Sequence, residues 1–349
     1  EMNPVRGFQS TVEPILHFGL GQNQSVDEIK VHWLNGTVQE MKNVKAGQKI
    51  EIVQNGQPML ADNQSKESRF KEATAELGIA YEHKENPYDD FAKEVLLPHK
   101  MSQFGPGIAV GDVNGDGLDD FYVGAASQSA GRLFVQSAQG EFKSKGVSAF
   151  EKDKKHEDID ATFLDIEGDG DMDLYVVSGG NEFAVDAPEL QDRLYVNDGK
   201  GNFSRAEGVL PQMLTSGGCV TASDYDQDGD MDLFVGGRLV PAKYPFPARS
   251  YILNNNEGVF TDVTAEVAPG VVNAGMVTSA VWADFNGDQK VDLVLSGEWM
   301  PIRFFEQKEN AFVERTEDFG FSNTTGWWFS LAAEDMDGDG DLDFVAGNL

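Results

Sequence analysis

The stretch Asp112-Val-Asn114-Gly-Asp116-Gly-Leu118-Asp-Asp120 decides the fold, because the same pattern returns four more times along the chain. The other copies are Asp165-Ile-Glu167-Gly-Asp169-Gly-Asp171-Met-Asp173, Asp224-Tyr-Asp226-Gln-Asp228-Gly-Asp230-Met-Asp232, Asp284-Phe-Asn286-Gly-Asp288-Gln-Lys290-Val-Asp292 and Asp335-Met-Asp337-Gly-Asp339-Gly-Asp341-Leu-Asp343. Successive copies begin 53, 59, 60 and 51 residues apart. A recurring period of this size indicates an array of similar structural units.

Each copy has the pattern of a loop that binds a hard cation. Oxygen-bearing side chains stand at positions 1, 3, 5 and 9, and glycine stands at position 6 in four of the five copies. Calcium takes six to eight oxygen ligands, which alternate residues of a tight loop can supply, and position 7 contributes only its backbone carbonyl. The sequence therefore predicts up to five Ca²⁺ sites. The predicted ligands are Asp112, Asn114, Asp116, Leu118 and Asp120; Asp165, Glu167, Asp169, Asp171 and Asp173; Asp224, Asp226, Asp228, Asp230 and Asp232; Asp284, Asn286, Asp288, Lys290 and Asp292; and Asp335, Asp337, Asp339, Asp341 and Asp343.

An EF-hand has a similar ligand order, but it requires a bidentate Glu at position 12 and a helix on each side. Position 12 is apolar in every copy: Val123, Val176, Val235, Leu295 and Ala346. The residues after position 9 are β-branched or aromatic and end at glycine, which is typical of strands. We therefore expect each loop to join two strands.

Acidic, glycine-rich segments also occur as solvated turns. Five copies with the same ligand positions favour metal binding, because unpaired carboxylates crowded this closely repel one another. The fourth loop is the weakest, since Gln289 replaces the turn glycine, Asn286 lowers the ligand charge and Lys290 adds a positive charge. We expect it to bind Ca²⁺ most loosely.

A second pattern, strand, turn and strand, follows the first four loops. These segments are Arg132 to Phe142, Arg193 to Phe203, Tyr251 to Phe260 and Arg303 to Phe312. Each repeat then contains four strands, the sequence signature of a propeller blade. Four complete blades and the start of a fifth are present. We expect an all-β fold, an open or incomplete ring, and a chain whose two ends continue in a longer protein.

From about residue 101 to the end, these repeats resemble the FG-GAP/VCBS family, whose calcium-loop blades also occur in integrin α-subunit heads. That resemblance implies a calcium-binding β-propeller, commonly of seven blades, in a secreted or cell-surface protein.

Residues 1–60 carry no such loop and contain short alternating segments, Val26–Trp33 and Ile50–Ile52, with a hairpin turn at Asn35-Gly36. Together with Arg6-Gly-Phe8 and His17-Phe-Gly-Leu-Gly21, they resemble the ASPIC/UnbV domain, which implies a bacterial surface or secreted context. Residues 61–100 are expected to form a linker. The sequence from Phe70 to Glu76 resembles that of the outer strand at Phe260 to Glu266, so this linker could supply a strand that closes the ring.

Composition restricts the partners. The chain of 349 residues has 59 acidic and 27 basic residues and a formal charge of −32, which disfavours nucleic acid. The single cysteine, Cys219, excludes an internal disulfide and is expected to be a buried thiol. No apolar run approaches the ~18 residues of a membrane span, and no signal segment is evident. The extracellular or bacterial-surface location is implied by the family resemblance alone.

The strand order places the loops on one face, and the connections after the second and the fourth strand of each blade on the other. Those connections carry residues typical of binding anchors: Arg238, Tyr244, Glu298, Trp299, Trp327 and Trp328. The same aromatic residues could instead wedge between blades. We expect a non-enzymatic binding or adhesion module for a protein or glycan. The alternatives are a propeller-type polysaccharide hydrolase or lyase and a structural spacer in a larger surface protein.

Overall fold

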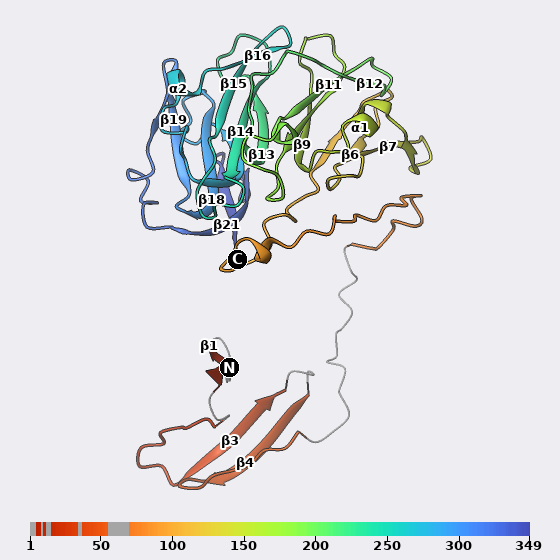
Figure 1. The fold of residues 1–349 in the computed structure, drawn as a ribbon. Coiled ribbons are helices and arrows are strands. Elements are labelled where there is room, and N and C mark those ends of the chain that lie inside the picture. The colour runs from red at the N-terminus through yellow and green to blue at the C-terminus, as the bar shows by residue number, and fades with distance from the viewer. Residues whose placement is uncertain (1–4, 8–9, 12–14, 34–36, 55–69) are drawn as a thin grey trace. The chain divides into compact units, whose positions relative to one another are not determined.

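The computed structural model describes residues 5–7, 10–11, 15–33, 37–54 and 70–349, and the chain forms two compact units, Glu1–Glu72 and Ala73–Leu349. Strands dominate both units (Figure 1). The described helices are short: the 3-10 turns η1 (Asp90–Ala92) and η2 (Pro188–Leu190), and α1 (Ser148–Lys152) and α2 (Thr264–Val267). The predicted all-β class is confirmed.

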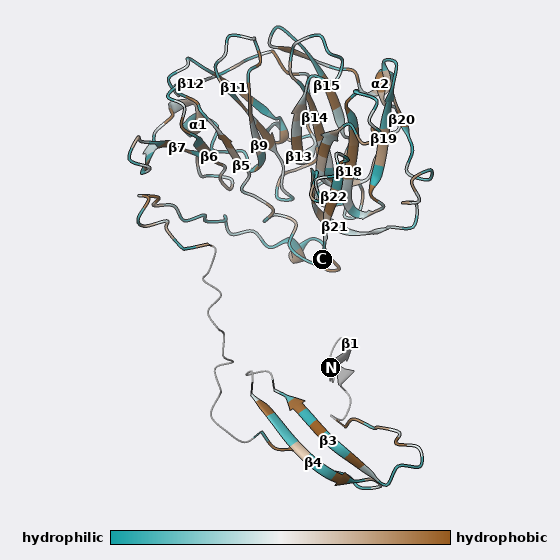
Figure 2. Cartoon of the chain, turned by 180° about the vertical axis from the view of Figure 1, so that it is seen from behind, coloured by the Kyte–Doolittle hydropathy of each residue, from teal (hydrophilic) through white to brown (hydrophobic). Residues whose placement is uncertain are grey.

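The first unit contains two strand pairs. β1 (Val5–Gly7) pairs with β2 (Ser10–Thr11), and β3 (Ser25–His32) pairs antiparallel with β4 (Val38–Lys45). Apolar and polar residues alternate along β3 and β4 (Figure 2). The predicted hairpin is therefore formed, although its Asn35-Gly36 turn lies outside the described residues. The expected strand at 50–52 was wrong: these residues are irregular. Side chains connect the neighbouring residues to the hairpin, since Gln39 donates to the carbonyl of Val53 at 3.1 Å and Gln54 donates to the Thr37 hydroxyl at 3.3 Å.

The second unit contains one antiparallel sheet for each of the first four loops and a strand pair for the fifth. The sheets are β5 (Ile108–Gly111), β6 (Asp120–Val123), β7 (Arg132–Gln136) and β8 (Phe142–Lys145); β9 (Asp158–Leu164), β10 (Asp173–Ser178), β11 (Arg193–Asn197) and β12 (Phe203–Arg205); β13 (Ser216–Ser223), β14 (Asp232–Leu239), β15 (Tyr251–Asn256) and β16 (Val259–Asp262); and β17 (Met276–Ala283), β18 (Asp292–Met300), β19 (Arg303–Lys308) and β20 (Ala311–Glu314). The fifth pair is β21 (Gly326–Glu334) and β22 (Asp343–Asn348), and β21 also pairs with the end of β18. Each loop joins two strands, which confirms the prediction and excludes an EF-hand.

The blades stack face to face in chain order. The first strands β5, β9, β13, β17 and β21 contact one another in succession and form the inner side of the array. Along β10, Leu174 and Val176 pack toward the first blade, whereas Tyr175 and Val177 pack toward the third. This period-two alternation buries both faces of each central strand. The result is the β-propeller architecture that the repeats predicted.

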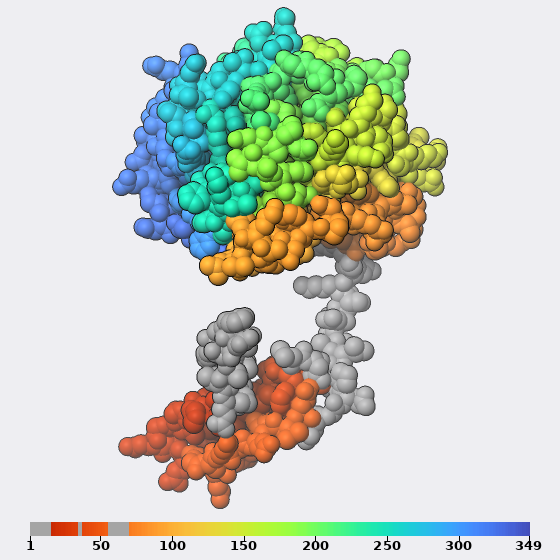
Figure 3. Space-filling view, in the orientation of Figure 1, coloured from red at the N-terminus to blue at the C-terminus, as the bar shows by residue number. Residues whose placement is uncertain are grey.

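Residues 77–104, here called the strap, cross the ends of four blades instead of forming a strand. Tyr81 donates to the carbonyl of Gly124 in blade one, and Tyr88 donates to the carbonyl of Asn181 in blade two. The backbone of Tyr244 in blade three donates to Glu94 at 2.8 Å. Figure 3 shows the strap as an orange band along this unit. The expected ring-closing strand is absent from the described residues 70–104, where side chains make most of the contacts to the blades. The Leu77 carbonyl accepts a backbone bond from Phe142 at the start of the outer strand β8.

Candidate functional site

The first aspartate of each loop folds the loop around its own carboxylate. In the first loop, Asp112 Oδ1 accepts from the backbone nitrogens of Gly115 and Asp116 at 2.8 and 3.2 Å, and Oδ2 accepts from Gly117 at 2.7 Å. These bonds lower the pKa of Asp112 despite the opposing effect of desolvation. Asp165, Asp224, Asp284 and Asp335 make equivalent bonds in the other loops. The position 1 carboxylate therefore holds the turn together by accepting hydrogen bonds from the loop backbone.

The turn requires left-handed backbone at positions 4 and 6. In the first loop, Gly115 and Gly117 have φ of 73° and 81°. Two loops place a non-glycine residue there: Gln227 at position 4 of the third loop, with φ of 62°, and Gln289 at position 6 of the fourth, with φ of 68°. A side chain in this region costs roughly 1–2 kcal/mol. The fourth loop therefore carries backbone strain at position 6, where Gln289 replaces the glycine of the other loops.

The aspartate at position 9 is buried in the four complete blades and ties the loop to the third strand. Asp120 accepts from the backbone of Gln136 at 2.7 Å, and Asp232 accepts from Asn255 at 2.8 Å. Burial raises the pKa of Asp232 to about 7. Asp173 and Asp292 occupy the same position, with pKa values raised by burial to about 7 and about 6. A cation near these carboxylates would favour their ionised form.

A side-chain amide links each of the first three loops to the following blade. Asn197, at the end of the third strand of blade two, donates to the carbonyl of Val113 in the first loop at 2.8 Å. Asn255 donates to Ile166 at 2.9 Å, and Gln307 donates to Tyr225 at 2.8 Å, across the next two junctions. In each case the acceptor is position 2 of the preceding loop. The loops therefore take part in contacts between blades.

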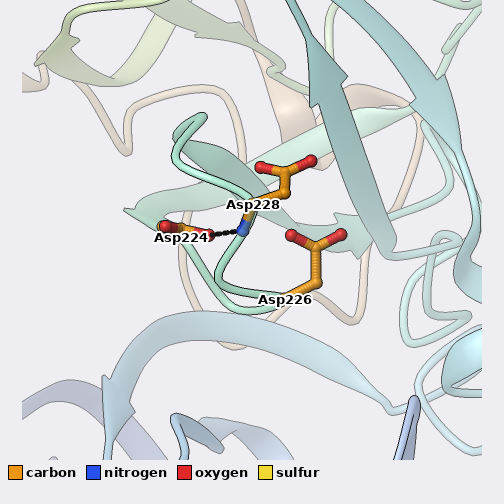
Figure 4. A group of neighbouring side chains, drawn as sticks. All are labelled: Asp224, Asp226 and Asp228. Atoms are coloured by element: carbon orange, nitrogen blue, oxygen red, sulfur yellow. Dashed lines mark hydrogen bonds between the residues drawn. The ribbon is translucent and has the colours of Figure 1, made fainter.

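The acidic side chains converge in two loops most clearly. Carboxylate oxygens of Asp224, Asp226 and Asp228 lie within 4.8 Å of one another, as do those of Asp335, Asp337 and Asp343. Figure 4 shows the first group, with the Asp228 nitrogen bonded to Asp224. Burial and the neighbouring charge of Asp228 raise the pKa of Asp226. An all-oxygen donor set of this kind fits a hard divalent cation such as Ca²⁺.

In the two loops with asparagine at position 3, the amide is turned to other partners. Asn114 donates to Asp120 at 3.2 Å, and Asn286 donates to Glu306 at 3.3 Å. The carbonyl oxygen of these amides is the atom that could ligate a cation.

On the opposite face, five of the six predicted anchor residues come together. Arg238 from β14 and Glu298 from β18 form a buried ion pair through Nη2 and Oε1. The hydroxyl of Tyr244 donates to Glu298 Oε2 at 3.2 Å and accepts from Trp299 Nε1 at 2.5 Å. Trp327 meets the Trp299 ring edge to face at 5.0 Å between centroids. We call these five residues the aromatic site.

The sixth predicted residue, Trp328, lies apart. Its indole nitrogen donates to the carbonyl of Thr324 at 2.8 Å, and its ring packs against the cluster around Phe304 between blade four and β21. Neighbouring residues of a strand face opposite sides, so Trp327 and Trp328 cannot share one surface. Trp328 therefore packs between blades, which is the alternative that the sequence also allowed for these aromatic residues.

Two residues of the strap also contact the aromatic site, although the sequence did not predict them. Phe104 lies under the Arg238 guanidinium, 3.6 Å from the ring centroid, and His99 Nε2 lies 3.8 Å from Glu298 Oε1. His99 also contacts the ring of Trp327. Burial lowers the pKa of His99. Neither residue belongs to a repeat, so no periodic signal could have found them.

Five calcium-type loops on stacked four-stranded sheets define a β-propeller repeat protein. The chain belongs to the family described as FG-GAP-like repeat, whose profile matches residues 112–176, 165–235 and 284–346, which include all five loops. Residues 1–58 match the family described as ASPIC and UnbV. Both resemblances inferred from the sequence are confirmed.

Among solved structures, the V. cholerae biofilm matrix protein Bap1 is 15% identical with a TM-score of 0.36, over 71% of this chain and 37% of that one. A structure titled Dos1 propeller is 11% identical with a TM-score of 0.37, over 64% of this chain and 60% of the other. The chain thus spans less than two thirds of either structure. No curated protein sequence matches it significantly. No helix in the described parts of the chain is long and apolar enough to cross a membrane.

Proposed function

We propose that the chain is a calcium-stabilised, non-enzymatic binding or adhesion module of a secreted or cell-surface protein, and that its aromatic site recognises a glycan or protein ligand. The proposal depends on one observation: the Trp299 side chain is exposed to solvent, although its indole nitrogen is held by a hydrogen bond to the Tyr244 hydroxyl. Trp299 is 55% exposed and has a φ of 57°. A strained, exposed, rigidly held aromatic residue is typical of a binding anchor.

The surroundings of Trp299 support a preorganised surface. Glu298, which is 1% exposed, receives bonds from Arg238 and Tyr244, and Tyr244 in turn holds Trp299. Preorganised rings lose little conformational freedom on binding, which improves affinity. Exposed aromatic faces suit the apolar faces of sugar rings and the apolar side chains of proteins alike.

Calcium is proposed as a structural ligand. The position 1 and position 9 aspartates organise the turn and the third strand, and the amide links extend from the loops to the next blade. A cation that binds only the folded form stabilises it by mass action. Catalysis is not part of the proposal, because Glu298 is held by Arg238 and Tyr244 on both of its oxygens.

The test is a glycan array and a surface-protein pull-down at fixed Ca²⁺ concentration, with Trp299→Ala as the variant. Loss of an anchor ring is expected to weaken binding at least tenfold, or about 1.4 kcal/mol. Val259→Ala, a 52% exposed position on the outer strand β16, is the control and should bind normally.

Binding that survives both Trp299→Ala and Trp327→Ala would contradict the proposed site. Cleavage of a bound polysaccharide would favour the enzyme, and absence of any binding would favour the spacer.

A further inference from the structure

Three glutamates meet under the strap, away from the calcium-type loops and the aromatic site. Glu85 belongs to the strap, Glu157 precedes β9, and Glu182 follows β10. A Cβ added at Gly180 would lie 3.4 Å from both Glu157 Cγ and Glu182 Oε2, so these two side chains flank the same point. We call Glu85, Glu157 and Glu182 the three-glutamate cluster.

Each carboxylate of this cluster is held by one oxygen only. Glu85 Oε1 lies 2.8 Å from His83 Nε2, Glu157 Oε2 accepts from the backbone of Ser127 at 2.6 Å, and Glu182 Oε1 accepts from the Asn86 amide at 2.8 Å. These bonds fix the three side chains in place and leave their second oxygens unengaged.

The second oxygens are buried and have no hydrogen-bond partner among the described residues: Glu85 Oε2, Glu157 Oε1 and Glu182 Oε2. Glu157 as a whole is 0% exposed. In the described parts of the chain, no lysine or arginine forms an ion pair with any of the three. An unpaired buried carboxylate oxygen costs ~1–3 kcal/mol or more, so three together need compensation.

The electrostatics of the cluster agree with the geometry. Burial, together with the charges of Glu182 and Glu85, raises the pKa of Glu157 to about 9 and so favours its neutral form. Burial and the charge of Glu85 also raise the pKa of Glu182. The cluster is thus a buried concentration of negative charge that either retains protons or accepts a cation.

We propose that the three-glutamate cluster binds a hydrated divalent cation, Ca²⁺ or Mg²⁺, which joins the strap to blades one and two. All-oxygen carboxylate ligands suit both ions, and Mg²⁺ in particular keeps several waters. Among the described residues, only the two loop groups bring three acidic groups within 4.8 Å, so water would bridge the cation to part of this cluster. The site depends neither on the loops nor on the aromatic site.

The first experiment locates the ion directly. Crystals of the full chain, grown without metal and soaked in Ca²⁺ or in Mn²⁺ as an anomalous probe, are expected to show density between the three glutamates. The same maps report the loops separately, so failure of the loop sites and failure of this site are distinguishable. Saturating soaks that leave the cluster without density would overturn the proposal.

The second experiment counts ions in solution. Glu157→Gln is expected to reduce the number of bound Mn²⁺ or Ca²⁺ ions by one per chain in equilibrium dialysis, whereas Glu141→Gln, at an exposed residue, should leave it unchanged. Without metal, Glu157→Gln should not lower the melting temperature, because it removes a buried acid. Glu182→Gln serves if Glu157→Gln does not fold. Unchanged stoichiometry in the folded variant would show that the cluster holds only protons.

Discussion

The side chain of Asn255 donates to the carbonyl of Ile166, 2.9 Å away in the preceding blade, while its backbone nitrogen donates to Asp232 of its own loop. One buried residue thereby connects two loops. The same arrangement at Asn197 and Gln307 makes the sequence of loops and amides a continuous hydrogen-bonded series along one face of the propeller. Calcium binding in one loop would therefore affect the packing of its neighbour.

Removing one amide from this series should destabilise the propeller. Asn255→Ala leaves the Ile166 carbonyl and the Gly258 nitrogen, its second partner, unpaired in a buried place. We expect a loss of about 2–4 kcal/mol in the free energy of unfolding, measured by urea denaturation. Asn256→Ala, at the exposed neighbouring residue, is the control and should change stability by less than about 0.5 kcal/mol. Equal stability of the two variants would contradict the role of the amide.

Restoring glycine to the fourth loop should strengthen it. Gln289→Gly relieves a left-handed residue with φ of 68° and should stabilise the chain by about 1 kcal/mol. Tighter Ca²⁺ binding by this loop should appear in calorimetric titration. Gln139→Gly, at an exposed turn residue without positive φ, should give no gain. A neutral result at Gln289 would mean that its strain is compensated elsewhere.

Chelation should loosen the blades. Each site saturated at 100 times its dissociation constant contributes about 2.7 kcal/mol, so thermal melting in EGTA should fall well below melting in millimolar Ca²⁺. Asp224→Asn, which weakens the ligand set of the third loop, should reduce the difference between the two conditions. Asp318→Asn, at an exposed residue outside the loops, should preserve it. Identical melting with and without chelator in the unaltered protein would refute structural calcium.

The free energy of unfolding should depend on pH through the titration of Asp192. This carboxylate is buried, accepts from the Tyr175 hydroxyl and the Ser178 nitrogen at 2.7 Å each, and has its pKa raised by desolvation to about 7. Because the folded form holds the proton more tightly, its contribution is greatest below about pH 4 and is lost as the pH rises to 7.

The measurement is the free energy of unfolding from pH 4 to 8 in chelator. Asp192→Asn should flatten the decline over this window by up to about 1.4 kcal/mol per pH unit, the limit for one proton. Asp318→Asn should leave the slope unchanged. A variant at Asp192 with the slope of the unaltered protein would show that other carboxylates carry the effect.

The repeats predicted most of the propeller because their signals are local. Loop ligands, apolar strand residues and turn glycines all lie within one blade, such as Asp158 to Arg205 or Ser216 to Asp262, and each blade repeats them. Most residues of the aromatic site could be predicted because Arg238 and Glu298 occupy equivalent positions near the ends of β14 and β18, and Tyr244 lies in the connection that follows β14. Trp328 was grouped with Trp327 by proximity in sequence, although strand geometry separates them.

The strap contacts and the three-glutamate cluster could not be predicted from the sequence, because the residues in contact are far apart along the chain and do not recur from blade to blade. Asn86 bonds to Glu182, and Tyr244 bonds to Glu94, across 96 and 150 residues. No period marks such pairs, and acidic residues are too common here to single out three of them. Only the folded chain shows which carboxylate oxygens are left without partners.

The strap also sets where the chain can be shortened. Leu97 and Met101 are buried together with Leu239 and Met276, and Asp90 holds Ser102 and Asn181 through its buried carboxylate. A version of the chain that starts at the first repeat would lack Leu97 and Met101. It would expose the apolar side chains of Leu239 and Met276 to solvent and would be prone to aggregation. A shortened chain for expression should therefore keep the strap and begin near residue 73, where the second compact unit starts, well upstream of the first recognisable repeat.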